Sequence, residues 1–121
     1  MKKIFLMTFL SLMMVFSVAS AQDVWFISYD GRDEYIETDS ITNEDDGIHV
    51  RTKVVFNGKY DNFNTYRCYS QNDSYLQVES YARFNGKWYV VNDKKFVAAL
   101  WEAMIPYMDQ KGIKYKKGLS Y

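Results

Sequence analysis

The segment from Ile48 to Phe56 constrains the fold of this chain more than any other part of the sequence. Every second residue in it is apolar or threonine, and the first three residues between them are His49, Arg51 and Lys53. Successive side chains of a strand point to opposite faces, so this period of two predicts a strand with one buried and one solvated face.

Turn residues divide the rest of the chain into further short strands. The expected strands cover residues 24–29, 34–38, 48–56, 65–70, 75–84 and 88–91. Asp30-Gly31 is a strong turn pair, whereas Asn57-Gly58 is expected to open a polar loop that runs to Asn64. Asn85-Gly86 predicts a two-residue type I′ turn, because both central residues of that turn need positive φ. Sequential hairpins of this kind favour an antiparallel meander.

The last part of the chain changes to a helical period. Its apolar residues are spaced four apart, with others beside them: Phe96, Val97, Leu100, Trp101, Met104, Ile105 and Met108. They predict an amphipathic helix that covers one face of a sheet. Asn92 or Asp93 is expected to cap its start, and Pro106 to end or kink it one turn before Gly112. The predicted class is therefore α+β, with five or six antiparallel strands and one C-terminal helix packed on one face.

The first residues predict export. Lys2 and Lys3 precede an apolar run from Ile4 to Val18, and Ala19-Ser20-Ala21 matches the pattern that signal peptidase accepts. Residues 1–21 are thus expected to be a cleaved signal peptide of the Sec route, leaving 22–121 as one exported sheet-plus-helix domain. The apolar run is shorter than the ~20 residues of a comfortable membrane span. We expect a periplasmic or secreted protein without a stable membrane span after cleavage.

The net charge of the mature chain argues against nucleic acid as a partner. Two of the fifteen basic residues belong to the signal, so the mature chain has thirteen basic and fifteen acidic residues, a net charge of −2. An exported chain without net positive charge is not expected to bind nucleic acid.

Cys68 is the only cysteine of the chain. A single cysteine cannot form an internal disulfide, although an exported protein enters an oxidising compartment. Because Cys68 lies in an expected strand with one core face, we predict a buried, unpaired thiol. A disulfide with a second copy of the chain is the alternative.

Short segments spread along the mature chain resemble a known family. They are Trp25-Phe26-Ile27, residues 35–41, Tyr66-Arg67-Cys68 and Gly86-Lys87-Trp88, followed by the terminal helix. Together they resemble the surface-adhesin protein E-like family, which implies a small exported domain with an antiparallel sheet and a C-terminal helix. The family commonly joins helix and sheet by a disulfide, whereas this chain has no second cysteine. Gln22 stands where a lipidated cysteine would be, so the chain is not expected to be a lipoprotein.

No strong catalytic signature is present. His49, the only histidine, is expected on the solvated face of its strand, and no nucleophile elbow accompanies it. The acidic cluster Glu44-Asp45-Asp46-Gly47 lacks the ligand spacing of an EF-hand loop. Neither a phosphate-binding glycine loop nor a zinc spacing occurs. We therefore predict no catalytic residue, no metal ligand and no cofactor, and not an enzyme.

The aromatic side chains provide the remaining functional prediction. If the helix covers the face of Leu76 and Val78, an exposed surface forms from the candidate contact residues Arg67, Tyr69, Tyr75 and Tyr81. Tyrosine and arginine are enriched where proteins contact partners, and a glycan partner is equally compatible. If the faces are reversed, these tyrosines pack under the helix instead.

The expected function is that of a non-catalytic binding module of the bacterial envelope, adhesin-like by resemblance. It would use the tyrosine-rich sheet face or an edge strand, and an edge strand or Cys68 could also join two copies. A small periplasmic enzyme or an enzyme inhibitor is the alternative. A deep pocket that gathers His49 with carboxylates would favour the enzyme, and a flat tyrosine-rich face would favour binding.

Overall fold

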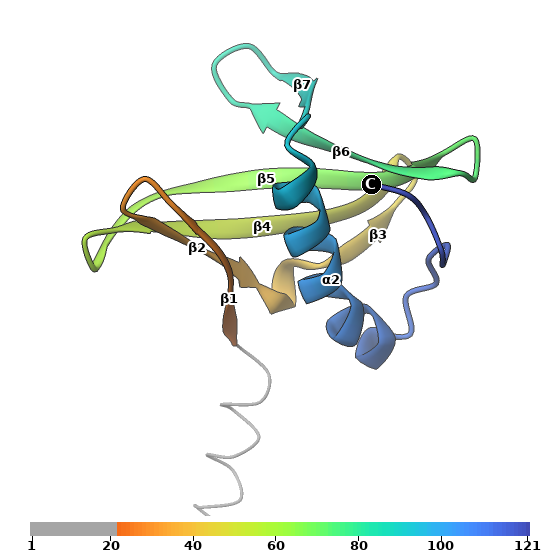
Figure 1. Ribbon diagram of the computed structural model, residues 1–121, viewed down its shortest axis with the longest axis horizontal. Coiled ribbons are helices and arrows are strands. Elements are labelled where there is room, and N and C mark those ends of the chain that lie inside the picture. The colour runs from red at the N-terminus through yellow and green to blue at the C-terminus, as the bar shows by residue number, and fades with distance from the viewer. Residues whose placement is uncertain (1–21) are drawn as a thin grey trace, which may run out of the picture.

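The computed structural model describes residues 22–121 as one antiparallel sheet crossed by a single helix (Figure 1). The strands are β1 (Asp23–Tyr29), β2 (Arg32–Glu37), β3 (Thr42–Glu44), β4 (Gly47–Phe56), β5 (Lys59–Gln71), β6 (Tyr75–Ala82) and β7 (Lys87–Val90), with a 3-10 turn η1 (Thr38–Ser40) and the helix α2 (Lys94–Lys111). The predicted α+β class is confirmed, with seven strands instead of five or six. The predicted signal peptide lies outside the described residues. Within residues 22–121, no helix is long and apolar enough to cross a membrane.

Apart from β3, the sheet is a meander in which strands that follow one another in the chain lie side by side. Its order is β1-β2-β4-β5-β6-β7, and β3 pairs with β4. β2 pairs with the second half of β4, from Thr52 to Phe56, whereas β3 pairs with its beginning, from Gly47 to His49. The turn η1 separates them, so β2 and β3 follow the same edge of β4.

Two tight turns have the geometry that their residues favour. Asp30-Gly31 joins β1 to β2 with φ values of 48° and 75°, and Asn57-Gly58 joins β4 to β5 with 49° and 77°. Positive φ at both central residues is the requirement of a type I′ turn. The polar loop expected from Asn57 to Asn64 is therefore wrong, because β5 begins at Lys59 directly after the turn. The first residues of β5 are exposed on both faces, so they carry no period-two signal.

The turn between β6 and β7 also differs from the prediction. Ala82 pairs with Lys87, so four residues form the connection instead of the expected pair Asn85-Gly86. Only Gly86 has positive φ, at 71°. The Asn85 side chain accepts a hydrogen bond from the Lys87 amide at 3.0 Å, an alternative turn that asparagine commonly makes.

The helix begins where the sequence predicts and extends beyond the predicted end. The Asp93 carboxylate caps it by accepting hydrogen bonds from the amides of Lys95 and Phe96. Pro106 was expected to end or kink the helix, and of these two effects the end is wrong, because α2 continues to Lys111 and is closed by Gly112 at a φ of 69°. Pro106 is exposed, so the carbonyl group that loses its amide partner lies on the solvent side of the helix.

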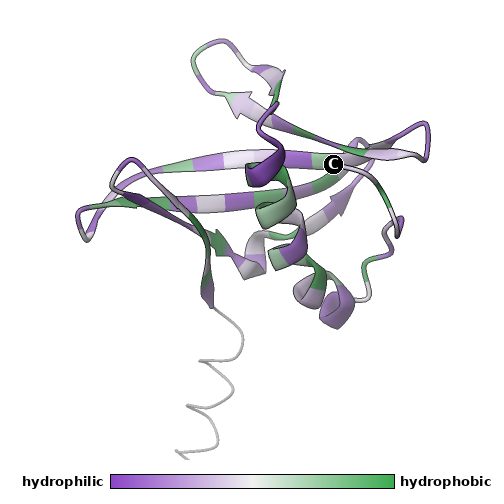
Figure 2. Cartoon of the chain, viewed as in Figure 1, coloured by the Kyte–Doolittle hydropathy of each residue, from purple (hydrophilic) through white to green (hydrophobic). Residues whose placement is uncertain are grey.

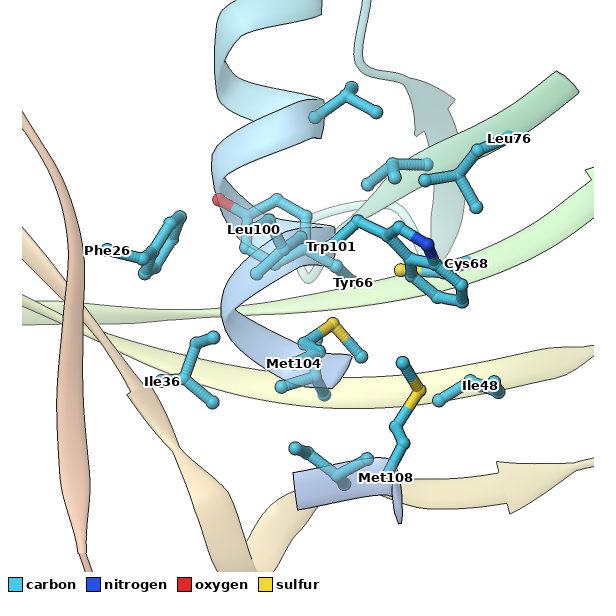
Figure 3. Close-up of a cluster of buried hydrophobic side chains, with 14 of the residues drawn as sticks. Phe26, Ile36, Ile48, Tyr66, Cys68, Leu76, Leu100, Trp101, Met104 and Met108 are labelled. Atoms are coloured by element: carbon cyan, nitrogen blue, oxygen red, sulfur yellow. The ribbon is translucent and has the colours of Figure 1, made fainter. Parts of the chain in front are cut away.

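The core lies between α2 and the sheet. Its helix residues are Phe96, Val97, Leu100, Trp101, Met104 and Met108. They pack on apolar side chains of the sheet, among them Val50 and Val78. Figure 3 shows two others, Cys68 and Leu76, beside Trp101. Colouring by hydropathy shows apolar and polar residues alternating along β4 and β5 (Figure 2), as expected for a sheet covered on one face.

Candidate functional site

The sheet face opposite α2, here called the open face, carries all four candidate contact residues. The structure places α2 over Leu76 and Val78, which belong to the core. Arg67 and Tyr69 alternate in β5 with the buried Tyr66 and Cys68. Tyr75 and Tyr81 alternate in β6 with Leu76 and Val78. Because neighbouring side chains of a strand point to opposite faces, all four lie on the open face.

Ionic hydrogen bonds cross the open face from β4 to β6. The register places His49, Arg67 and Glu79 side by side on three adjacent strands. The Arg67 guanidinium donates to Glu79 Oε1 from Nε at 2.6 Å and to Asp46 Oδ2 from Nη1 at 2.9 Å. His49 Nε2 lies 2.6 Å from Asp46 Oδ1. These hydrogen bonds, first that with His49 and then that from Arg67, lower the pKa of the Asp46 carboxyl from its ordinary value.

Trp88 covers this charged row. Its ring centroid lies 4.4 Å from Arg67 Cζ, 5.4 Å from the His49 ring and 5.1 Å from the Tyr81 ring. A guanidinium at this distance from an indole face is stabilised by a cation–π interaction. Arg67, Tyr81, Trp88 and His49 thus form one packed group, the Trp88 cluster.

Sequence reasoning did not assign Trp88 to the site, although the alternation of side chains along β6 and β7 already placed it on the same face as Tyr81. Trp88 lies directly opposite Tyr81 in the observed register. The expected two-residue turn would have shifted this register by two residues, which leaves side chains on the same face. Trp88 therefore falls on the face of Tyr81 with either turn.

Tyr69 and Tyr75 belong to a neighbouring group on the same face. The Tyr69 hydroxyl accepts a hydrogen bond from Gln77 Nε2 at 2.7 Å. The Tyr75 hydroxyl donates to the Gln71 side-chain oxygen and lies 3.4 Å from Gln77 Oε1. The structure therefore separates the four candidates into two pairs, Arg67 and Tyr81 around Trp88, and Tyr69 and Tyr75 around Gln77.

A second cation–π group on the open face joins β4, β5 and the segment after β6. The Phe63 ring lies between two guanidinium groups, 4.2 Å from Arg51 Cζ and 4.1 Å from Arg83 Cζ. Arg51 is also ion-paired with Glu37 at 2.7 Å. Sequence reasoning missed Phe63 because its segment was expected to be a loop.

The β6–β7 hairpin adds exposed aromatic side chains at one end of the open face. It extends away from the part of the sheet that α2 covers (Figure 1). Phe84, at its tip, is 88% exposed, and Tyr81 is 37% exposed. Among the described residues the backbone of β7 pairs only with β6, so the outer edge of β7 is available for another strand.

The structure of residues 22–121 does not bring His49 and the carboxylates together as a catalytic or metal-binding site. His49 lies on the open face with Asp46 as its one carboxylate partner. Three pockets occur near α2, two at its start and one beside the segment that follows it. His49 lines none of these three. In the part of the chain that the structure describes, no group of three or more His, Cys, Asp or Glu side chains is placed to hold a metal ion.

The thiol of Cys68 is buried between the sheet and α2. It is 1% exposed, and desolvation by burial raises its pKa to about 12 from an ordinary value of 9.0. Pairing with a second copy through this thiol would require displacement of α2.

Burial of the Cys68 thiol predicts a loss of stability in alkaline solution. The folded-state pKa is raised, so the unfolded chain loses the thiol proton first as pH rises above 9. Between about pH 8 and pH 10, the free energy of unfolding should fall by about 1.4 kcal/mol more in the native chain than in Cys68→Ala. Urea unfolding of both proteins at the two pH values measures this difference. Parallel pH profiles, or rapid reaction of the native thiol with a thiol reagent, would contradict the burial.

Comparison of the chain with protein-family models, with curated proteins and with solved structures finds no match. The resemblance to the surface-adhesin protein E-like family stays a prediction.

Proposed function

We propose that the mature chain is a non-catalytic binding module of the bacterial envelope that recognises a protein partner through the open face. The observation that carries the proposal is the Trp88 cluster, in which Trp88 and Tyr81 pack with Arg67 beside an exposed hairpin. Tryptophan, tyrosine and arginine are the residues most enriched among those that dominate binding energy. The ion pairs of Arg67 hold this group in place before a partner arrives, which reduces the entropy lost on binding.

A protein partner is favoured over a glycan because the Trp88 cluster adjoins the outer edge of β7. A polypeptide strand can pair with that edge while its side chains contact Tyr81 and Trp88. A second copy of this chain is one such polypeptide. Export rests on the predicted signal peptide, and an adhesin-like role rests on the family resemblance alone.

The setting of His49 supports a binding module over the alternative of a periplasmic enzyme, and an enzyme inhibitor would itself be a module that binds a protein. His49 is hydrogen-bonded to Asp46 and covered on one side by Trp88. It lines none of the three pockets described above. General acid–base catalysis needs a group within reach of a bound substrate, and a flat face offers little enclosure for one.

The proposal predicts that binding depends on which face of the hairpin is altered. The mature domain would be immobilised and tested against envelope extract, host matrix proteins and a glycan array. Tyr81→Ala and Trp88→Ala should each weaken the recovered interaction by about tenfold or more. Tyr89→Ala is the matched control, because Tyr89 lies opposite Ser80 and so points to the other face. Its effect should stay within about twofold.

The same experiment can overturn the proposal. If glycans alone are retained, the protein partner is wrong. If Tyr81→Ala and Tyr89→Ala weaken binding equally, the open face is not the contact surface. Melting temperatures of the three variants establish that any loss of binding occurs in folded protein.

A further inference from the structure

A pocket on the helix side of the sheet lies outside the proposed contact surface. It opens between the end of β1 and the start of α2 and has a volume of about 400 Å³. Small-molecule sites commonly have volumes of roughly 300–1,000 Å³. The rings of Tyr29, Tyr66 and Phe96 line it, and Ile27 and Val91 extend the apolar wall.

The charged groups of this pocket are acidic. Asp30 and Asp93 line it, and its lining contains no lysine, arginine or histidine. Asp93 is partly compensated, because its Oδ1 accepts the two amide hydrogen bonds that cap α2. The neighbouring bases are Arg32 and, directly after Asp93, Lys94 and Lys95. The Arg32 guanidinium donates to the Asp30 carbonyl oxygen at 3.5 Å, stacks on Phe56 and lies 3.7 Å from an Asp61 oxygen.

A buried carboxylate lies behind the two tyrosines. Glu34 is fully buried and accepts hydrogen bonds from Tyr29 at 2.8 Å, from Tyr66 at 3.0 Å and from Thr52 at 2.5 Å. None of the ion pairs within residues 22–121 includes Glu34. Three neutral hydroxyl groups therefore surround this acid.

The direction of these hydrogen bonds determines what the pocket offers a ligand. A tyrosine hydroxyl has one proton, and Tyr29 and Tyr66 both donate it to Glu34. Their oxygens can then only accept a hydrogen bond from a ligand. Asp30 is also an acceptor, and Ser80 adds one neutral hydroxyl. The pocket thus combines aromatic walls with hydrogen-bond acceptors and negative charge.

We propose that this pocket binds a small organic cation, an amine carried on an apolar or aromatic body. The ammonium group supplies the donors that Asp30 and the tyrosine oxygens lack, and aromatic rings attract cations. The body of the ligand packs against Phe96 and the apolar wall. An anion of the same shape meets the like charge of Asp30 and Asp93 and the acceptor oxygens of the tyrosines, with the Ser80 hydroxyl as the one free side-chain donor of the lining.

Three probes that share a phenylethyl skeleton test the sign of the ligand charge. Phenethylamine, 2-phenylethanol and phenylacetate would be titrated into the mature protein while amide chemical shifts are recorded. Phenethylamine should bind with a Kd of roughly 1 mM, at least about tenfold more tightly than phenylacetate. Its shift changes should centre on Tyr29, Tyr66 and Phe96. Equal binding of the three probes, or no binding of the amine, overturns the proposal.

A pair of matched variants tests the position of the site. Asp30 and Asp73 both occupy turns with positive φ, at 48° and 54°. Asparagine tolerates this conformation, so Asp30→Asn and Asp73→Asn should fold and change the net charge equally. Asp30→Asn should weaken phenethylamine binding by roughly two- to fivefold, as expected for one partly solvated charge, and Asp73→Asn should not. Equal effects of the two variants would place the cation elsewhere. Trp88→Ala should leave amine binding unchanged, which separates this site from the open face.

Discussion

Replacing Trp101 with alanine is expected to lower the free energy of unfolding by about 3–5 kcal/mol. Trp101 is 6% exposed and lies in the centre of the packed cluster between α2 and the sheet (Figure 3). Its ring also meets the Tyr115 ring edge-to-face, with 5.7 Å between the centroids. With Cys68 as the only cysteine, no disulfide joins α2 to the sheet. Core packing attaches the helix, and at its end Lys111 Nζ donates to the carbonyl oxygens of Thr38 and Ile41 at 2.7 and 3.0 Å. A loss of this size is a large fraction of the about 5–15 kcal/mol that stabilises a typical domain.

Urea unfolding followed by circular dichroism measures the effect of Trp101→Ala, and Trp25→Ala is the matched control. Trp25 has the same side chain but is 54% exposed, at the edge of the sheet in β1. Its removal should cost less than about 1 kcal/mol. An unchanged unfolding midpoint for Trp101→Ala would show that the helix does not pack on the sheet at this position.

Replacing Glu34 with alanine is expected to cost about 2–5 kcal/mol. The change removes the shared acceptor of Tyr29, Thr52 and Tyr66. Thr52 and Tyr66 are buried, so their hydroxyl groups lose a hydrogen bond that water cannot readily replace. A buried polar group left without a partner costs about 1–3 kcal/mol. Glu34→Gln keeps one acceptor oxygen and should cost less than Glu34→Ala when both are measured by urea unfolding.

Two further measurements identify the cause of the loss at Glu34. Glu37→Ala removes another carboxylate of β2 whose ion pair with Arg51 is partly solvated, and it should cost at most about 1 kcal/mol. Adding Thr52→Val to Glu34→Ala should destabilise less than the sum of the single changes, because it removes one of the orphaned hydroxyl groups. Strict additivity would show that Glu34 and Thr52 are not coupled.

Elements with a complete local pattern were predictable. Strand β4 follows from the period of two after Ile48, and the start of α2 follows from Asp93 and the apolar stripe behind it. The first residues of β5 show no alternation of apolar and polar side chains, because they are exposed to solvent on both faces of the strand. The β6–β7 turn was mispredicted because the Asn85 side chain bonds to the Lys87 amide, which competes with the type I′ conformation.

The open face was partly predictable for a related reason. Alternation places Arg67 and Tyr81 on the face opposite Leu76 and Val78 once the position of the helix is known. It cannot show that Trp88 reaches Arg67 and His49, because these contacts join β7 to β5 and β4 across the sheet.

The burial of Glu34 is the clearest example of a feature that the local sequence does not predict. Nine acidic residues occur between Gln22 and Val50, and nothing in the sequence distinguishes Glu34 among them. Its burial depends on three hydroxyl groups from β1, β4 and β5, which only the folded sheet brings to one carboxylate.

Periodicity along the chain was thus sufficient for the α+β class and the two faces of the sheet, because these depend on the direction of neighbouring side chains. The turn pairs between the strands indicated the antiparallel order. The pocket lined by Tyr29 and Tyr66 and the Trp88 cluster depend on distances between strands that are far apart in the chain. Those distances exist only after register and helix position have been set by packing of the whole core.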